Sequence, residues 1–195
     1  MVNNYIGIGT LTANFENIPN TNRKGSTLQI TIANKTYLIP VTIDNNTILP
    51  KKIRLDKRVY IEGSVRSYPE KDGDVSHNRL HVHAKTITYA NATDKDTSFV
   101  HIQGTVHSKP YSCTKGDKPL TQTLCVVPTL NRMYYIPVIA WSKSSKFLAD
   151  CHVGQEVDVV GTFVSRNFKK YIGDTCYNRT TYEIVASRVI HLGGE

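Results

Sequence analysis

Tyr135 and Trp141 are large aromatic residues on one short apolar segment, Met133–Trp141, which reads MYYIPVIAW and holds the only tryptophan of the chain. Side chains alternate between the faces of a β-strand, so one face would carry Tyr134, Ile136, Val138 and Ala140 and the other Tyr135, Pro137, Ile139 and Trp141. The first set is typical of a core. The second set spaces two rings about 20 Å apart, at about 3.3 Å per residue. It is either a second packed face or an exposed aromatic platform, whose chemistry would be stacking on planar groups.

The motifs of common catalytic sites do not occur in the sequence. It contains no Walker A loop, H-E-x-x-H, G-x-S-x-G or D-x-D-G loop. His81 and His83, in HVH, would share one strand face and could begin a metal site, but no third ligand follows at a suitable spacing. We therefore expect a protein that is not an enzyme and has no cofactor and no metal.

The four cysteines, Cys113, Cys125, Cys151 and Cys176, form no C-x-x-C pair. Zinc sites usually take two ligands from one short loop, and disulfides are rare in the cytosol. We expect these cysteines to be small and mostly buried side chains.

Charge and hydropathy narrow the class of protein. Lys and Arg number 24 against 16 Asp and Glu, a formal charge of +8 that favours an anionic partner without proving one. The N-terminal segment MVNNYIGIGTLTANF is no signal peptide, and no apolar run approaches the ~18 residues of a membrane span. We expect a cytoplasmic protein that does not contact a membrane.

The chain consists of two copies of one pattern. The offset between matching segments grows slowly from 95 to 102, as it would if duplicated domains differed in loop length. The matches are Gly9–Leu11 with Gly104–Val106, Ile39–Val41 with Ile136–Val138, Val59–Val65 with Val157–Phe163, and Leu80–Ile87 with Tyr182–Val189. We expect domains at 1–92 and 98–193, joined by the polar segment Asn91–Thr97.

Apolar residues alternate in five runs per copy, which predicts five strands with one buried face each. The expected strands are 4–13, 27–33, 36–43, 57–67 and 79–89, then 98–108, 121–128, 132–141, 155–166 and 179–191. One short helix is expected between the third and fourth strands of each copy, at Thr47–Leu55 and Ser142–Cys151. This order predicts an all-β protein made of two tandem OB-fold barrels, a fold that commonly binds oligonucleotides or oligosaccharides.

Glycine and proline add local expectations. Gly63 and Gly161 fall mid-strand, where a barrel strand must bend sharply. Pro40 and Pro137 each remove a ladder donor, which predicts a bulge or an unpaired edge.

The second copy resembles the bacterial and phage single-stranded DNA-binding proteins. The resemblance covers Val100–Leu192 and rests on IPVIAWSKSSKFLADCHVGQEVDVVGTFVSRNF followed by RTTYEIVASRV. These segments give an aromatic at the end of the third strand, a short helix, a V-x-V-x-G strand, a Ser-Arg-aromatic segment and Tyr-x-Glu in the last strand. The first copy keeps the pattern of strands but few of these residue motifs.

The resemblance implies that Tyr135 and Trp141 stack on bases, as does Phe168 on the loop between the fourth and fifth strands. Tyr134 could replace Tyr135 in another register. In the same loop, NFKKYIGD interleaves Phe168 and Tyr171 with two lysines. Stacking contributes roughly 1 to 3 kcal/mol per base, and cations add a salt-dependent term. The candidate cations are Lys109, Lys115, Lys118, Arg132, Lys143, Arg166, Lys169, Lys170 and Arg179.

The first copy places Leu38 opposite Tyr135 and Asp44 opposite Trp141, so its equivalent site is degenerate. Tyr37, Arg66 and Tyr68 could still contact a strand. The first domain could instead serve for dimerisation or as the pseudo-dimeric partner of the second, giving a homodimer or a pseudo-dimeric monomer.

The leading hypothesis is non-catalytic, largely sequence-independent binding of single-stranded DNA in replication or recombination. One alternative is a replication adaptor that mainly binds a helicase or primase. The other is a scaffold that binds a protein or a sugar and has no nucleic-acid function. The tandem arrangement, and an end at HLGGE where family members commonly carry an acidic-tipped tail, suggest by analogy a phage, plasmid or other mobile element.

Overall fold

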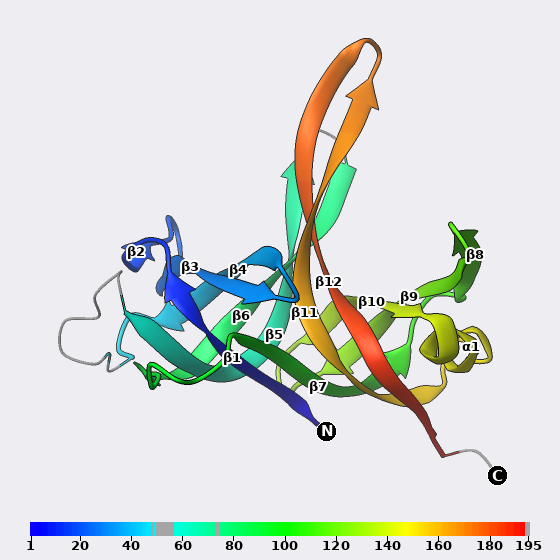
Figure 1. The fold of residues 1–195 in the computed structure, drawn as a ribbon, viewed down its shortest axis with the longest axis horizontal. Coiled ribbons are helices and arrows are strands. Elements are labelled where there is room, and N and C mark those ends of the chain that lie inside the picture. The colour runs from blue at the N-terminus through cyan, green and yellow to red at the C-terminus, as the bar shows by residue number, and fades with distance from the viewer. Residues whose placement is uncertain (48, 50–56, 73–74, 194–195) are drawn as a thin grey trace.

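A computed structural model of the chain describes residues 1–47, 49, 57–72 and 75–193. In this part of the chain the strands join into one twelve-stranded sheet that curls into two barrels lying side by side (Figure 1). The first barrel contains β1 (Asn3–Leu11), β2 (Glu16–Asn17), β3 (Arg23–Ile32), β4 (Lys35–Asp44), β5 (Arg58–Asp72) and β6 (Val75–Tyr89). The second contains β7 (Thr97–Val106), β8 (Tyr111–Lys115), β9 (Lys118–Pro128), β10 (Met133–Trp141), β11 (Glu156–Ile172) and β12 (Thr175–Leu192).

The two barrels repeat the same pairings. In the first, the order is β2-β3-β4-β6-β5-β1, with β3 also pairing β1 to close the barrel; in the second it is β8-β9-β10-β12-β11-β7, closed by β9 and β7. Both barrels include one parallel pair, β4 with β6 and β10 with β12. The expectation of an all-β protein made of two tandem OB-fold barrels is confirmed.

The barrels meet through antiparallel pairing of their first strands. Tyr5 of β1 pairs Val100 of β7, and Gly7 pairs Ser98. Tyr5 and Val100 are equivalent positions at the repeat offset of 95, so this pairing is symmetric about them and marks a pseudo-two-fold axis. Tyr5 is fully buried and packs edge-on against Phe163 of the other barrel, with ring centroids 6.2 Å apart. The interface is therefore continuous with both cores.

The inward residues of the strands form the core, as the alternation predicts. In β10, Tyr134, Ile136, Val138 and Ala140 are buried, whereas Tyr135 and Trp141 on the opposite face are only half-buried. The helix α1 (Ser142–Ala149) follows β10 directly and buries Leu148. The predicted helix at Thr47–Leu55 falls almost entirely outside the described residues. Within them, no helix has the length and apolar character to cross a membrane.

Gly63 and Gly161 each lie at a β-bulge. The β11–β12 register shifts between Val160 and Gly161, and the β5–β6 register shifts between Glu62 and Gly63. A Cβ at Gly161 would lie 2.4 Å from the Val185 carbonyl oxygen, and one at Gly63 would lie 2.2 Å from that of His83. The missing side chain thus allows the close backbone approach that bends each barrel.

No bulge occurs at either proline. The β9–β10 register runs through Pro137 without a shift, and the pairing of β10 with β12 begins only at the next residue, Val138. Pro40 precedes the β4–β6 pairing in the same way. Each proline therefore lies at a locally unpaired edge, where the missing N–H removes no ladder bond.

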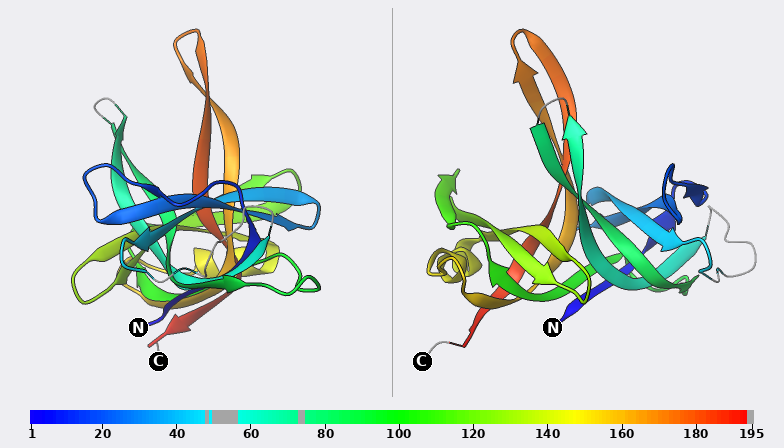
Figure 2. Two further views of the ribbon diagram at one scale, coloured as in Figure 1. Left: turned by 90° about the vertical axis from the view of Figure 1, so that its left-hand side faces the viewer. Right: turned by 180° about the vertical axis from the view of Figure 1, so that it is seen from behind.

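The segments between the fourth and fifth strands correct the sequence expectation most strongly. They are not loops: β5 and β6, and likewise β11 and β12, continue as two long hairpins. We call the paired segments Ser67–Asp72 and Val75–Leu80 the first arm, and Ser165–Ile172 and Thr175–Tyr182 the second arm. Both arms leave the barrels on the same side (Figures 1 and 2). The short strands β2 and β8 were also missed, because their residues are largely exposed and give no apolar alternation.

Candidate nucleic-acid interface

The barrels dock on each other's arms through two equivalent hydrogen bonds. The backbone N–H of Tyr135 in β10 donates to Ser67 Oγ on the first arm at 2.8 Å. The backbone N–H of Leu38 in β4 donates to Ser165 Oγ on the second arm at 2.9 Å. Leu38 and Tyr135 are related by the repeat, as are Ser67 and Ser165. The β3–β4 hairpin of the first barrel thus reaches the second arm, and the β9–β10 hairpin of the second barrel reaches the first arm. A groove forms at each of these two junctions.

The junction at Leu38 and Ser165 holds a cavity of about 690 Å³, which we call the Trp groove. Trp141 and Arg166 from the second barrel line it together with Tyr37 and Lys35 from the first. Arg166 pairs with Glu183 at 3.2 Å and lies over the Phe168 ring, with its guanidinium carbon 5.8 Å from the ring centroid. Tyr182 also lines the groove, which therefore combines three rings with a cation held in place and an exposed lysine.

The junction at Ser67 holds a cavity of about 530 Å³, which we call the Arg groove. Three arginines line it, Arg23 and Arg66 from the first barrel and Arg132 from the second, with the rings of Tyr68 and Tyr134. The guanidinium carbon of Arg66 lies 5.9 Å from the Tyr134 ring centroid, a cation–π contact between the barrels. Burial lowers the pKa of Arg66 below its ordinary value; Tyr134 and Asp44 oppose this shift, whereas the charges of Arg23 and Arg132 add to it. The three guanidinium groups thus bring positive charge together at this junction.

His81 also lines the Arg groove and is only 4% exposed. Burial first, and then the charges of Arg23, His83 and Arg66, lower the pKa of its imidazole to about 3, so the ring is neutral. Among the described residues neither ring nitrogen has a hydrogen-bond partner. His83 lies on the same strand face, as predicted, but it contacts Thr42 at 3.2 Å and Asp44 at 3.4 Å. Within the described ranges no three His, Cys, Asp or Glu side chains are grouped to hold a metal ion.

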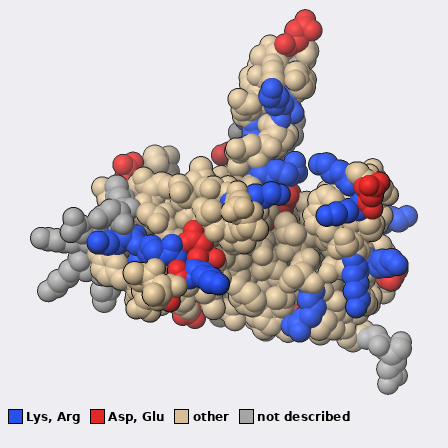
Figure 3. All heavy atoms as spheres, viewed as in Figure 1, with Lys and Arg blue, Asp and Glu red and all other residues tan. Residues whose placement is uncertain are grey.

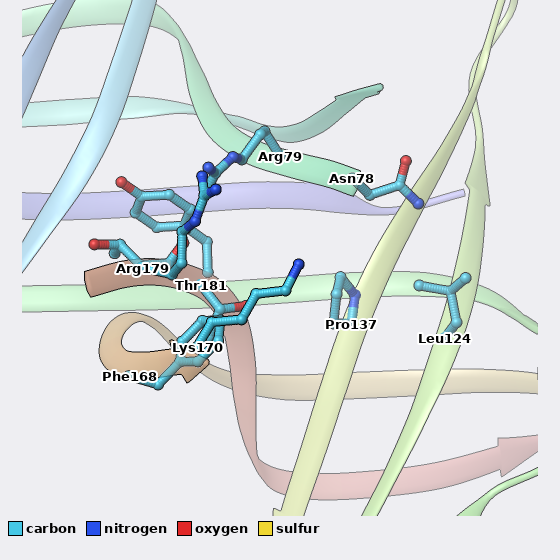
Figure 4. A pocket seen from close by; sticks show the side chains of 10 residues that line it. Asn78, Arg79, Leu124, Pro137, Phe168, Lys170, Arg179 and Thr181 are labelled. Atoms are coloured by element: carbon cyan, nitrogen blue, oxygen red, sulfur yellow. The ribbon is translucent and has the colours of Figure 1, made fainter. Parts of the chain in front are cut away.

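A third, smaller cavity of about 240 Å³ lies between the arms (Figure 4). Phe168, Lys170 and Arg179 of the second arm line it with Arg79 of the first arm and Pro137 of β10. The guanidinium groups of Arg79 and Arg179 point toward one another, and Lys170 extends across the cavity (Figure 4). Arg79 also donates to the Thr180 carbonyl at 2.6 Å and pairs with Glu70, so it ties the two arms together.

The second arm separates residues that the sequence reading grouped. Phe168 lies within β11, not on a loop, and pairs Arg179 of β12. Because side chains alternate along the strand, Phe168 and Lys170 share one face with Arg179, whereas Lys169 and Tyr171 lie on the other. Tyr171 is 67% exposed. The NFKKYIGD segment is therefore not one continuous clamp.

The remaining predicted residues lie outside the three cavities described above. Tyr135 packs edge-on against His107, with ring centroids 5.1 Å apart. Lys115 and Lys118 pair across the β8–β9 turn, and Lys143 lies in α1, at the end of the second barrel away from the arms (Figure 1). Lysines and arginines gather at the foot of the second arm and over the second barrel (Figure 3). The expectation of mostly buried cysteines is half wrong: Cys125 and Cys151 are buried, but Cys113 is half-buried and Cys176, on the polar arm, is exposed.

The structure places two predicted residues in the groove of the opposite barrel's site, and it adds residues that the sequence did not indicate. Tyr37 belongs to the groove of Trp141, and Arg132 belongs to the groove of Arg66 and Tyr68. Lys35 and Arg23 were not predicted as groove residues, and Tyr134 was considered only as a replacement for Tyr135. Lys35 corresponds to Arg132, and Tyr37 to Tyr134, at the offset of 97. The repeat in the sequence shows this correspondence. It does not show that the barrels pair through β1 and β7, which brings these residues to the grooves.

No family model matches the sequence, and no curated protein matches it. Two solved structures of the single-stranded DNA binding protein from Thermus aquaticus have a similar fold. A deletion mutant superposes with a TM-score of 0.75 at 17% identity, over 100% of this chain and 96% of that chain. The wild-type protein superposes with a TM-score of 0.72 at 18% identity, over 100% of this chain and 94% of that chain. The similarity establishes the tandem fold along the whole chain.

Proposed function

We propose that this chain binds single-stranded DNA without catalysis and largely without sequence preference, and so belongs with the single-stranded DNA-binding proteins. The observation that carries the proposal is the Trp groove, where Trp141, Tyr37 and Arg166 converge at the junction of two barrels. Rings offer faces on which any base can stack, and cations offer a backbone contact that is blind to sequence. The similar solved structures are of a protein described as binding single-stranded DNA.

We further propose the domain boundaries 1–92 and 98–193, and a setting in replication or recombination in the cytoplasm. The residues proposed to contact the strand fall into two sets. Those that line the cavities are Tyr37, Arg66, Tyr68, Arg132, Trp141, Arg166, Phe168, Lys170 and Arg179. Those that would extend the contact beyond them are Lys115, Tyr135, Lys143, Lys169 and Tyr171.

Competition between single strands and duplex tests this function. The full chain is titrated into fluorescein-labelled oligo-dT at several salt concentrations while anisotropy is followed, and unlabelled oligo-dT or duplex of equal length is added as competitor. We expect binding that weakens with salt, and far more effective competition by the single strand than by the duplex. Equal competition by duplex, or no binding at low salt, would contradict the proposal and favour the adaptor or scaffold alternatives.

A further inference from the structure

Neither groove is complete within one barrel. The Trp groove takes Trp141 and Arg166 from the second barrel but Tyr37 and Lys35 from the first. The Arg groove takes Arg23, Arg66 and Tyr68 from the first barrel but Arg132 and Tyr134 from the second. The cross-barrel bonds from Tyr135 to Ser67 and from Leu38 to Ser165 hold both junctions in place. A ligand in either groove therefore contacts both barrels at once.

The two grooves differ in chemistry although the repeat relates them. The Trp groove has the larger cavity and the only tryptophan, and the carboxylate of Glu183 pairs with its arginine. Its surplus cation is Lys35, which is exposed on the β3–β4 hairpin. This composition suits stacking of bases, with a modest contribution from charge.

The Arg groove is suited to an anion. Three guanidinium groups line one cavity, and among the described residues one of them, Arg23, forms an ion pair, with Asp44 at 3.6 Å. Guanidinium forks bind phosphate oxygens in a bidentate manner.

We infer that the strand is bound by two composite grooves with different roles: the Trp groove stacks bases, and the Arg groove neutralises phosphates. This inference rests on the proposed function and deepens it. The first barrel is then part of the binding site, rather than a scaffold for the second.

Double-mutant cycles on the full chain test which residues share a groove. Lys35→Ala, Trp141→Ala and their combination are compared by the anisotropy of labelled oligo-dT. A second cycle combines Lys35→Ala with Tyr68→Ala, which lies in the other groove. Lys35 is exposed, so its loss should not unfold the chain; Tyr37→Ala, at a half-buried ring, is compared in the same way and checked by circular dichroism.

We expect the effects of Lys35→Ala and Trp141→Ala to be non-additive by at least about threefold in Kd, because contacts within one site couple. Lys35→Ala and Tyr68→Ala should be additive. If Lys35 coupled with Tyr68 and not with Trp141, or if Lys35→Ala bound like wild type, the inference of composite grooves would be overturned. The proposed single-strand binding would not be affected by that result. If the wild-type chain did not bind oligo-dT, the proposed function and this inference would fall together.

Salt dependence tests the division of roles. Arg132→Ala should lower the slope of log Kd against log salt by about 0.7, the value of one single-strand phosphate contact. Trp141→Ala should weaken binding and leave the slope unchanged. Lys146→Ala, at an exposed position of α1 outside both grooves and both proposed contact sets, is the control for loss of one positive charge. Loss of slope in Trp141→Ala but not in Arg132→Ala would overturn the assignment.

Discussion

The backbone N–H of Tyr135 donates a 2.8 Å hydrogen bond to Ser67 Oγ and so joins the second barrel to the arm of the first. Its counterpart, from Leu38 to Ser165, is the same contact with the barrels exchanged. These bonds decide which residues face each other across the grooves. The proposed binding surface is therefore a property of the pair of barrels.

The docking bonds should stabilise the chain as a unit. Ser67→Ala should cost about 1 kcal/mol of unfolding free energy, because it removes a part-buried hydrogen bond. Ser165→Ala should cost up to about 1 kcal/mol, because the bond that it removes is exposed. In a chain of this size that corresponds to roughly 2 to 4 °C in Tm, measured by thermal unfolding. Ser112→Ala, which removes a bond to Thr121 inside the second barrel, is the control.

In that experiment, oligo-dT affinity should fall in the two docking variants and be unchanged in Ser112→Ala. The prediction would be wrong if Ser67→Ala and Ser165→Ala kept both the Tm and the affinity of wild type.

Trp141 should dominate the stacking contribution. Trp141→Ala should weaken oligo-dT binding by roughly 5- to 150-fold, the equivalent of one stacked base at about 1 to 3 kcal/mol, while Trp141→Phe should recover part of the loss. Phe147→Ala is the matched control, because this ring is 46% exposed on α1 and lines neither groove. An equal loss in Phe147→Ala and Trp141→Ala, by anisotropy, would count against a specific groove.

The tandem barrels could be predicted from sequence because their cores are periodic. Segments such as Ile136–Val138 alternate between core and surface, and the repeat at Ile39–Val41 confirms the register. The glycines at the bulges were likewise recognisable, since Gly63 and Gly161 interrupt otherwise strong strand patterns.

The second arm could not be predicted because its described residues bury little on either face. From Arg166 to Lys169 every residue is exposed, so no apolar alternation identifies a strand. The composite grooves depend in addition on the pairing of Tyr5 with Val100, which fixes how the barrels face each other. That register depends on contacts between segments far apart in the sequence, so it cannot be predicted from the pattern of either copy by itself.

The bulge glycines should tolerate no side chain. Gly161→Ala should destabilise the fold by about 1 to 3 kcal/mol, as overpacking does, because its Cβ would lie 2.4 Å from the Val185 carbonyl oxygen. Gly63→Ala should behave alike for the same reason. Urea unfolding of both variants measures the effect, and a wild-type midpoint in either would show that the bulge can relax at no cost.

His81 should make stability depend on pH. The unfolded chain protonates this ring near pH 6.5, whereas burial lowers the pKa in the folded protein to about 3. The unfolded state therefore binds more protons between these values, and stability is lost as the pH falls from about 6.5 toward 3. His83, whose pKa burial lowers to about 4, acts in the same direction. Urea midpoints should fall from pH 7 to pH 4.

His81→Phe should flatten part of this dependence while keeping a ring against Tyr68, whose centroid lies 5.5 Å away. His152→Phe, at an exposed position, should keep the wild-type slope. A His81→Phe variant with the full wild-type slope would exclude His81 as the source.

The fluorescence of Trp141 during a titration with oligo-dT tests the central claim most directly. Trp141 is the only tryptophan and lines the groove proposed to hold the strand, so its emission reports on that site alone. We predict strong, saturable quenching by oligo-dT at low salt that is reversed by added salt and weakened in Lys35→Ala. Emission that does not change while anisotropy reports a bound strand would place the DNA elsewhere on the protein and contradict the account.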